Sequence, residues 1–376
     1  ANGRLQFGIH AKLSQQQLEH LVEEFSFWLK AVIQHTTELS RSYLTRSDIG
    51  NIIRQEYLDR LQQEREIEGV YQANSLQQGF IYHHLSAGEG DSAYRVQAVF
   101  EYHNELTEEL LKAAWEGALR RYPGLRLRFA WDEEIVQVID KDNQLDWTYR
   151  DLSWLEETQQ EEILQQLLIE DRQRGYDLQA GNLLRIYLLK CAVDHYLCVV
   201  SNHHAILDGW SNPRLLGYVH ELYENLSNSD AVGRKSLLSA IHAEDGYGLS
   251  QKYLQEQRDS AEEYWQGQIS EVTEFTDLSG LLKPSKRGIR LSEYRRIEER
   301  AVSRGNLAGA DYRRIKEFSL KHGVTVNALL QYAWHKVLSI YGNSKVTVVG
   351  TTIAGRSLPV DGIENSVGLY INTCLL

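Results

Sequence analysis

Apolar residues recur at the spacing of a helix face in several parts of the chain. In the segment 13–35, Ser14 and Gln17 occupy the two positions of a capping box, which predicts that a helix starts there. Seven apolar residues then share one face of this helix: Leu18, Leu21, Val22, Phe25, Leu29, Val32 and Ile33. The same spacing predicts further helices over 107–122 with Thr107 as N-cap, from Ser211 and Pro213 onward, over 311–323 and over 325–342.

Between these helices lie short apolar or alternating segments that are typical of β-strands. They are residues 92–102, 125–131, 134–140, 183–190, 195–202, 345–353 and 367–376. The second and third predict a strand pair joined at Asp132–Glu133, and the fourth and fifth predict a hairpin. Residues 36–51 lack periodicity and read as a linker. Residues 52–68 are helix-like but highly charged, which predicts a solvated connecting helix.

Composition narrows the class of protein. The chain has 376 residues, of which 42% are hydrophobic, so it can bury a large core in two or more domains. Its net charge is −12 and its basic residues are scattered, which argues against a nucleic-acid partner. No apolar stretch is long enough to cross a membrane and no leader pattern is present, so we expect a cytoplasmic protein. Cys191, Cys198 and Cys374 lie in apolar segments and are expected to be buried, reduced thiols.

Polar residues that could take part in catalysis follow the apolar strand 195–202, in the sequence NHHAILDGWS. Side chains at the end of a buried strand can reach a cleft, and Asp208 could orient an imidazole or an arginine from a tight loop at Gly209. The alternative is that His203 and His204 are strand-end residues satisfied by the backbone. A metal site on this pair is disfavoured, because adjacent residues of a strand point to opposite faces. No serine or cysteine nucleophile motif lies nearby.

The string HHAILDG resembles the HHxxxDG motif of condensation domains of nonribosomal peptide synthetases. Three further stretches resemble family segments in the same order. Residues 74–85, NSLQQGFIYHHL, resemble the first helix, and residues 120–129, RRYPGLRLRF, resemble the arginine segment, with Tyr122 and Pro123 where the family often has His-Glu. Residues 367–373, VGLYINT, resemble the late VGxFxNT strand. The resemblance covers about residues 68–376.

The resemblance implies a mixed α/β fold of two chloramphenicol-acetyltransferase-like lobes that form a V, with the site between them. The N-terminal lobe is expected over 68–255 and the C-terminal lobe over 256–376, with the second lobe incomplete because later family segments are absent. Residues 46–67 are then a linker. Residues 1–45 resemble the tail of an upstream epimerization domain, which together with SLQQGFIYH favours a D-configured donor.

The implied activity is peptide-bond formation between two thioesters, each carried on the phosphopantetheine arm of a carrier domain. No cofactor and no metal are expected in the domain itself. Its implied partners are an upstream donor carrier, a downstream acceptor carrier, and the neighbouring epimerization and adenylation domains.

The resemblance also distributes roles within the site. His204 is the expected base or positioning group, whereas His203 and Gly209 shape the turn. Arg126 aligns with the arginine that pairs with the motif aspartate, so Asp208 and Arg126 are expected to hold the loop together. Candidates for lining a substrate tunnel are Ser75, Gln78, Trp210, Ser211 and Asn372.

Three other functions remain open on the sequence. The same architecture could epimerize a single carrier-bound residue, or transfer another acyl group. A degenerate domain could only dock carriers, although His203, His204, Asp208 and Gly209 all match the motif. Exchange of the Cα proton with solvent would distinguish an epimerase from a condensing enzyme.

Overall fold

The computed structural model describes residues 6–86, 93–270, 272, 276, 278 and 302–376, so part of the second lobe expected over 256–376 lies outside the described residues. The largest sheet has the strand order β2-β7-β6-β5. Its strands are β2 (Arg95–Tyr102), β5 (Asp146–Asp151), β6 (Leu184–Ala192) and β7 (His195–His203). All neighbours in it are antiparallel except β5 and β6. The pairing of β6 with β7 confirms the predicted hairpin.

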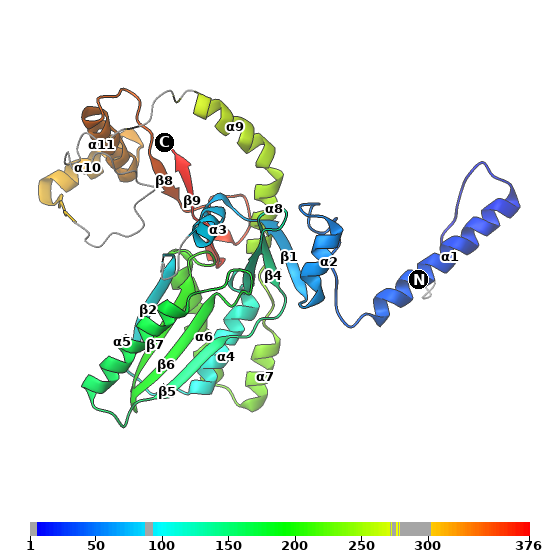
Figure 1. Ribbon diagram of the computed structural model, residues 1–376, viewed down its shortest axis with the longest axis horizontal. Helices are drawn as coiled ribbons and strands as arrows, with labels where there is room; N and C mark the ends of the chain where they lie inside the picture. Colours follow the sequence, from blue (N-terminus) through cyan, green and yellow to red (C-terminus); the bar gives the residue numbers. More distant parts are fainter. Residues whose placement is uncertain (1–5, 87–92, 271, 273–275, 277, 279–301) are drawn as a thin grey trace.

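Helices cover both faces of this sheet (Figure 1). One face carries α4 (Glu108–Arg121) and α6 (Ser211–Ser227), which is followed by α7 (Ala231–Ser239), and the other carries α5 (Glu157–Arg174). The predicted apolar face of α4 is buried, with Trp115 fully enclosed. Full burial of one such side chain stabilises the fold by about 1.5–3 kcal/mol. Thr107 is the N-cap of α4 as predicted, although its side chain makes no capping hydrogen bond.

A second sheet has the antiparallel order β1-β4-β3, and its strands are β1 (Ile67–Gln72), β3 (Leu127–Ala130) and β4 (Val136–Asp140). The predicted strand pair β3–β4 is confirmed. The short 3-10 helix η1 (Pro123–Arg126) leads into β3. Helix α2 (Gln55–Gln63) packs on this sheet through Tyr57 and Leu58, which are 3% and 0% exposed. The expectation of a solvated connecting helix is therefore wrong, because the charges of α2 occupy only its outer face.

A segment near the end of the chain packs into the core of the first lobe. Residues 363–371 contribute Ile363, Val367, Leu369 and Tyr370 to the same apolar cluster as α4, α6 and β7. The segment begins with the 3-10 helix η5 (Ile363–Asn365), and α3 (Ser75–Ser86) and α8 (Gly246–Glu256) lie next to this end of the chain. Only the last part of the strand predicted over 367–376 forms, as β9 (Asn372–Leu375), paired with β8 (Gly350–Ile353). The buried half is an extended loop, because its backbone N–H groups bond to Asp208 and Ser211 instead of to a neighbouring strand.

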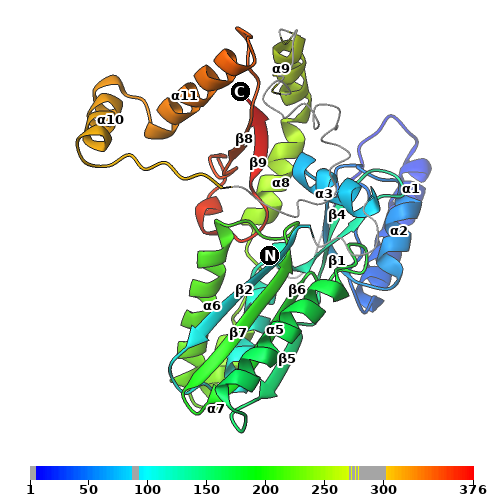
Figure 2. The same cartoon turned by 60° about the vertical axis from the view of Figure 1, so that its left-hand side comes forward.

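Four helices lie apart from these cores. They are α1 (Gln15–Glu38), α9 (Arg258–Ser270), α10 (Gly309–His322) and α11 (Val326–Tyr341), and Leu338 is their one buried residue among those described. The predicted capping box of α1 is confirmed, since Ser14 and Gln17 bond reciprocally. Figure 1 shows α1 projecting from the sheets, and Figure 2 shows α10 and α11 beyond β8 and β9. Periodicity predicted α1, α10 and α11 but not α9, and the apolar faces of these helices are not buried in the described part of the chain.

Two further expectations concern membranes and cysteines. Among the described residues, no helix is long and apolar enough to cross a membrane. Cys191 and Cys198 are buried free thiols as expected, and burial raises the pKa of Cys198 to about 12. Cys374 is partly exposed at β9, so the expectation of burial is wrong for this residue.

Candidate functional site

Strand β7 positions the histidine pair. It runs buried from Tyr196 to His203, and the backbone N–H of His204 then donates to the carbonyl of Tyr94 at 2.8 Å. Tyr94 has a φ of 62°, a left-handed conformation that is rare for a bulky residue. Such strained backbone is found preferentially at functional sites. The turn that carries His204 thus continues from β7 and is hydrogen-bonded to the residue directly before β2.

His203 is a scaffold residue. Its side chain is 5% exposed, lies between the rings of Phe80 and Tyr176, and accepts the backbone N–H of Ala205 at Nδ1 over 3.1 Å. Burial, helped by the nearby positive charges of His84, His204 and Arg95, lowers the pKa of His203 to about 3. The ring is therefore neutral at physiological pH, with its proton on Nε2.

His204 is the motif histidine that reaches the surface. Its ring is partly exposed and packs 5.7 Å, centroid to centroid, from Phe80, which also contacts Tyr94. Its Nδ1 is buried and has no hydrogen-bond partner among the described residues. Among the residues that the structure describes, no carboxylate contacts this ring, in contrast to the histidine of a serine-protease triad.

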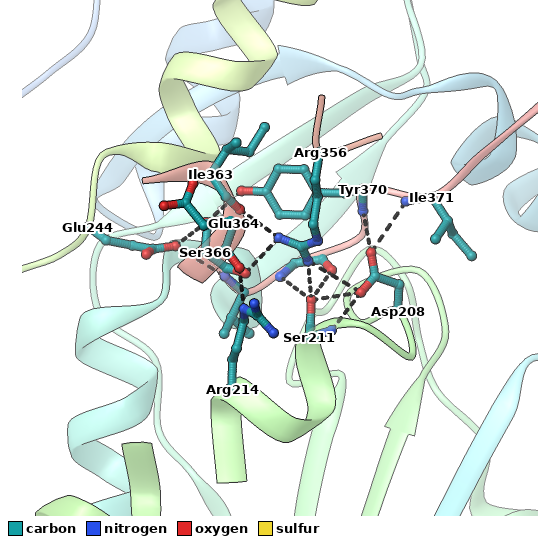
Figure 3. A network of polar contacts seen from close by, with 12 residues as sticks. Asp208, Ser211, Arg214, Glu244, Arg356, Ile363, Glu364, Ser366, Tyr370 and Ile371 are labelled. Atoms are coloured by element: carbon teal, nitrogen blue, oxygen red, sulfur yellow. Dashed lines mark hydrogen bonds and ion pairs between the residues drawn. The ribbon is translucent and has the colours of Figure 1, made fainter. Parts of the chain in front are cut away.

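Asp208 fastens the motif loop to the late segment of the chain (Figure 3). Its carboxylate is fully buried and accepts the backbone N–H groups of Tyr370 at 2.9 Å and Ile371 at 3.3 Å. It also accepts the N–H and the hydroxyl of Ser211, each at 2.8 Å. An ion pair of 3.4 Å joins it to Nη2 of Arg356.

The expected pair of Asp208 with Arg126 is wrong. Arg126 lies in η1 and points away from the motif, where it pairs with Glu68 at 2.7 Å and donates to the carbonyls of Leu119 and Lys141. Arg356 takes the expected place instead. It also donates to the carbonyls of Ile363 and Ser366 and lies 4.1 Å from the Tyr370 ring centroid. The signal for Arg356 was its place in GRSLPVDGIENS, directly before the late strand.

Two other expectations for the loop also need correction. Ser211 is fully buried, so it does not line a tunnel; its oxygen contacts Asp208, Arg356 and the backbone of Gly368 at 2.7–3.0 Å. Gly209 is exposed, does not have a positive φ, and has space for a Cβ. The turn therefore does not require glycine for its conformation. Trp210 is 56% exposed beside it.

A family model described as "Condensation domain" matches residues 67–376. The chain belongs to the condensation-domain family. It is 41% identical over 305 residues to N-(5-amino-5-carboxypentanoyl)-L-cysteinyl-D-valine synthase of Amycolatopsis lactamdurans, covering 80% of this chain and 8% of that protein. It is 31% identical over 376 residues to bacitracin synthase 3 of Bacillus licheniformis, covering 97% of this chain and 6% of the synthase. The chain thus spans less than a tenth of either relative.

Solved structures support the fold. The starter condensation domain of rhizomide synthetase RzmA aligns with a TM-score of 0.56 at 17% identity, covering 82% of this chain and 66% of that one. At this identity the likeness shows the mixed α/β fold alone. The fold class inferred from the sequence is confirmed.

The structure brings two of the tunnel candidates of the condensation domain together. The hydroxyl of Ser75, at the start of α3, donates to Oδ1 of Asn372 at the start of β9 over 2.8 Å. Gln78 is exposed and donates to the carbonyl of Ala73. That Ser75, Gln78, Trp210 and Asn372 line a tunnel stays a prediction.

A buried polar network packs against the motif loop, and the sequence analysis did not predict it. Nε2 of Gln77 contacts the carbonyl of Ala205, within the motif loop, and Oε1 of Gln137, each at 3.3 Å. Gln137 in turn donates to Gln251 and accepts from Tyr247, both in α8. The signal was the glutamine pair of NSLQQGF, whose first member also caps α3 reciprocally with Asn74. The loop is therefore tied to α3, β4 and α8.

Glu244 is a second residue that the sequence analysis left unassigned. It lies directly before α8, and its carboxylate accepts the hydroxyl of Ser366 and the backbone N–H of Val367. Burial raises the pKa of Glu244, and these hydrogen bonds only partly oppose that effect. Together with Asp208, it anchors residues 366–371 against the first lobe.

Proposed function

We propose that this condensation domain forms a peptide bond between two substrates that are held as thioesters on carrier domains. The α-amine of the acceptor attacks the carbonyl carbon of the donor thioester. A C–N bond forms, the C–S bond breaks, and the thiolate of the donor phosphopantetheine leaves with the proton that the amine releases. The domain needs no cofactor of its own for this chemistry.

The observation that carries the proposal is the contrast between the two motif histidines. His203 is buried, neutral and bonded to the backbone, whereas the His204 ring reaches the surface from a turn that neighbouring elements hold rigidly. A fixed turn is what a positioning group requires, since small displacements of a reacting group reduce rates strongly.

His204 acts mainly as a hydrogen-bonding group toward the attacking nitrogen. An α-amino group has a pKa of about 8, so roughly a tenth is already neutral at pH 7. A strong base is therefore not needed to create the nucleophile. His204 accepts the N–H proton as the C–N bond forms and passes it on toward the leaving thiolate.

We also propose that the donor ends in a D-residue and that residues 1–45 are the tail of an epimerization domain. Two sequence features support this: the resemblance of SLQQGFIYH to the D-donor subclass, and the resemblance of residues 1–45 to such a tail. The partners would then be a donor carrier behind an epimerization domain, and an acceptor carrier behind an adenylation domain.

The test supplies the purified chain with separately loaded donor and acceptor carriers. Amide product is expected, with faster transfer from a D-configured than from an L-configured donor. A second reaction contains the donor carrier alone in deuterated water. Deuterium at Cα without amide formation in the first reaction would identify an epimerase and refute the proposal. If neither amide product nor Cα deuteration appeared, the domain would only dock carriers, and this result would also refute the proposal.

A further inference from the structure

Three potential metal ligands meet at the end of β7 that lies away from the motif. They are Glu101 of β2, His103 just after β2, and His195 at the start of β7, and one ligand atom from each lies within 4.8 Å of the other two. Because β7 has nine residues at about 3.4 Å each, this cluster lies roughly 27 Å from the histidine pair. Neither the proposed reaction nor the family motifs use these residues.

The sheet register holds the cluster together. Glu101 is paired with Leu197 and Tyr102 with Tyr196, so the next position places His103 opposite His195. Side chains two residues apart on a strand share a face, and directly opposite residues share it as well. Glu101 lies opposite Leu197, which packs on the α5 side of the sheet, so all three groups belong to that face at the end of β2 and the start of β7. The strands themselves preorganise the ligands.

The distances suit a tetrahedral ion. Nε2 of His103 lies 3.3 Å from a carboxylate oxygen of Glu101. With metal–ligand bonds of about 2.0–2.1 Å, two ligands of a tetrahedral zinc ion are about 3.4 Å apart. The rings of His103 and His195 are nearly parallel, at 9°, with centroids 5.2 Å apart, so one ring must rotate for both imidazoles to bind the same ion.

An unsatisfied atom points to a missing ligand in the same place. Nε2 of His195 is buried and has no hydrogen-bond partner among the described residues. A buried ring nitrogen without a partner is unfavourable, and a bound cation would satisfy it. Two imidazoles and one carboxylate are the donor set that Zn²⁺ accepts with a fourth position open to water.

We propose that Glu101, His103 and His195 bind a divalent cation of the zinc class. The ion would join the end of β2 to the hairpin between β6 and β7 and so stabilise this edge of the sheet. By the Irving–Williams order, Co²⁺ and Ni²⁺ should occupy the same site, whereas Mg²⁺ should not.

The test uses the purified chain, free of any affinity tag and of chelator. Titration with ZnCl₂ in a calorimeter should give one saturable site, and zinc should raise the melting temperature. His195→Ala and His103→Ala should each lower the affinity at least about 10-fold and abolish the thermal shift. His35→Ala, in the exposed helix α1, is the matched control and should change neither.

Three outcomes would overturn the proposal. A dissociation constant above roughly 1 mM would show that the cluster is an ordinary ion pair with a stacked ring. Equal loss of affinity in His35→Ala would indicate dispersed surface binding. Finally, Co²⁺ bound with a sulfur-to-metal charge-transfer band would indicate that a cysteine, and not this ligand set, holds the ion.

Discussion

The ion pair between Asp208 and Arg356 predicts a measurable interaction free energy between substitutions at these two positions. Asp208→Asn removes the charge that Tyr370, Ile371, Ser211 and Arg356 all contact, and it turns an amide N–H toward donors. Arg356 is 6% exposed in its side chain, so it would be left as a buried cation without its carboxylate. Removing one partner of a buried ion pair typically destabilises a protein by about 3–5 kcal/mol.

The two arginines should behave differently in double-mutant cycles. Asp208→Asn and Arg356→Met share contacts, so we expect their interaction free energy to be about 0.5–3 kcal/mol. Asp208→Asn and Arg126→Met should be additive within about 0.5 kcal/mol, because Arg126 pairs with Glu68 and shares no partner with Asp208. Arg126→Met alone should still be destabilising, since it leaves Glu68 and buried carbonyls unpaired.

The free energies of unfolding come from urea titrations followed by circular dichroism at constant pH, with the slope of each transition checked for equality. If Asp208→Asn is too unstable to measure, Ser211→Ala takes its place, because Nη2 of Arg356 donates to the Ser211 hydroxyl at 2.8 Å. An interaction free energy between Asp208→Asn and Arg126→Met, together with additive effects of Asp208→Asn and Arg356→Met, would refute the pairing of Asp208 with Arg356.

Three further predictions follow from the packing around the site. The pKa of His203 is lowered from 6.5 to about 3, so its contribution to stability is complete above pH 6.5 and is lost as pH falls toward 3. His203→Asn should therefore flatten the pH dependence of urea midpoints between pH 6.5 and 4. An unchanged slope would contradict the assignment of His203 as a buried neutral ring. Gly355 has a φ of 66°, and a Cβ there would lie 1.9 Å from the Tyr370 carbonyl oxygen. Gly355→Ala should therefore lower the melting temperature strongly, whereas Gly209→Ala should leave it nearly unchanged. Equal shifts in melting temperature for the two variants would contradict this geometry. Leu58→Ala should lower the free energy of unfolding by about 2–5 kcal/mol, and a loss below 0.5 kcal/mol, on the order expected for a surface position, would restore the solvated-helix interpretation of α2.

The sequence predicted the elements better than their burial. Continuous apolar letters in β6 and β7, and a three-and-four spacing in α4 and α6, reflect local geometry that any core imposes. The charges of α2 misled because Tyr57 and Leu58, which decide its packing, are only two residues of a short helix. Apolar spacing in α1 marked a helix face correctly but contains no information about what covers it.

Long-range partners within the site could not be read from the pattern. Alternation along a strand predicts that His203 and His204 face opposite ways, and the structure buries His203 while His204 is partly exposed. Arg356 lies 148 residues from Asp208 in the chain, and its alignment depends on residues 366–371 entering the core of the first lobe. Arg126 and Arg356 are both arginines near family-like segments, and only tertiary packing distinguishes them.

The most direct test of the proposed function is single-turnover amide formation by His204→Ala with both carriers loaded in advance. His203→Asn and His35→Ala serve as controls, and each variant must show the wild-type urea transition slope before its rate is compared. We expect His204→Ala to form product at least about 100-fold more slowly than the wild type, the lower range for loss of a proton-accepting group. A wild-type rate in folded His204→Ala would contradict the assignment of His204 as the reacting residue of this site.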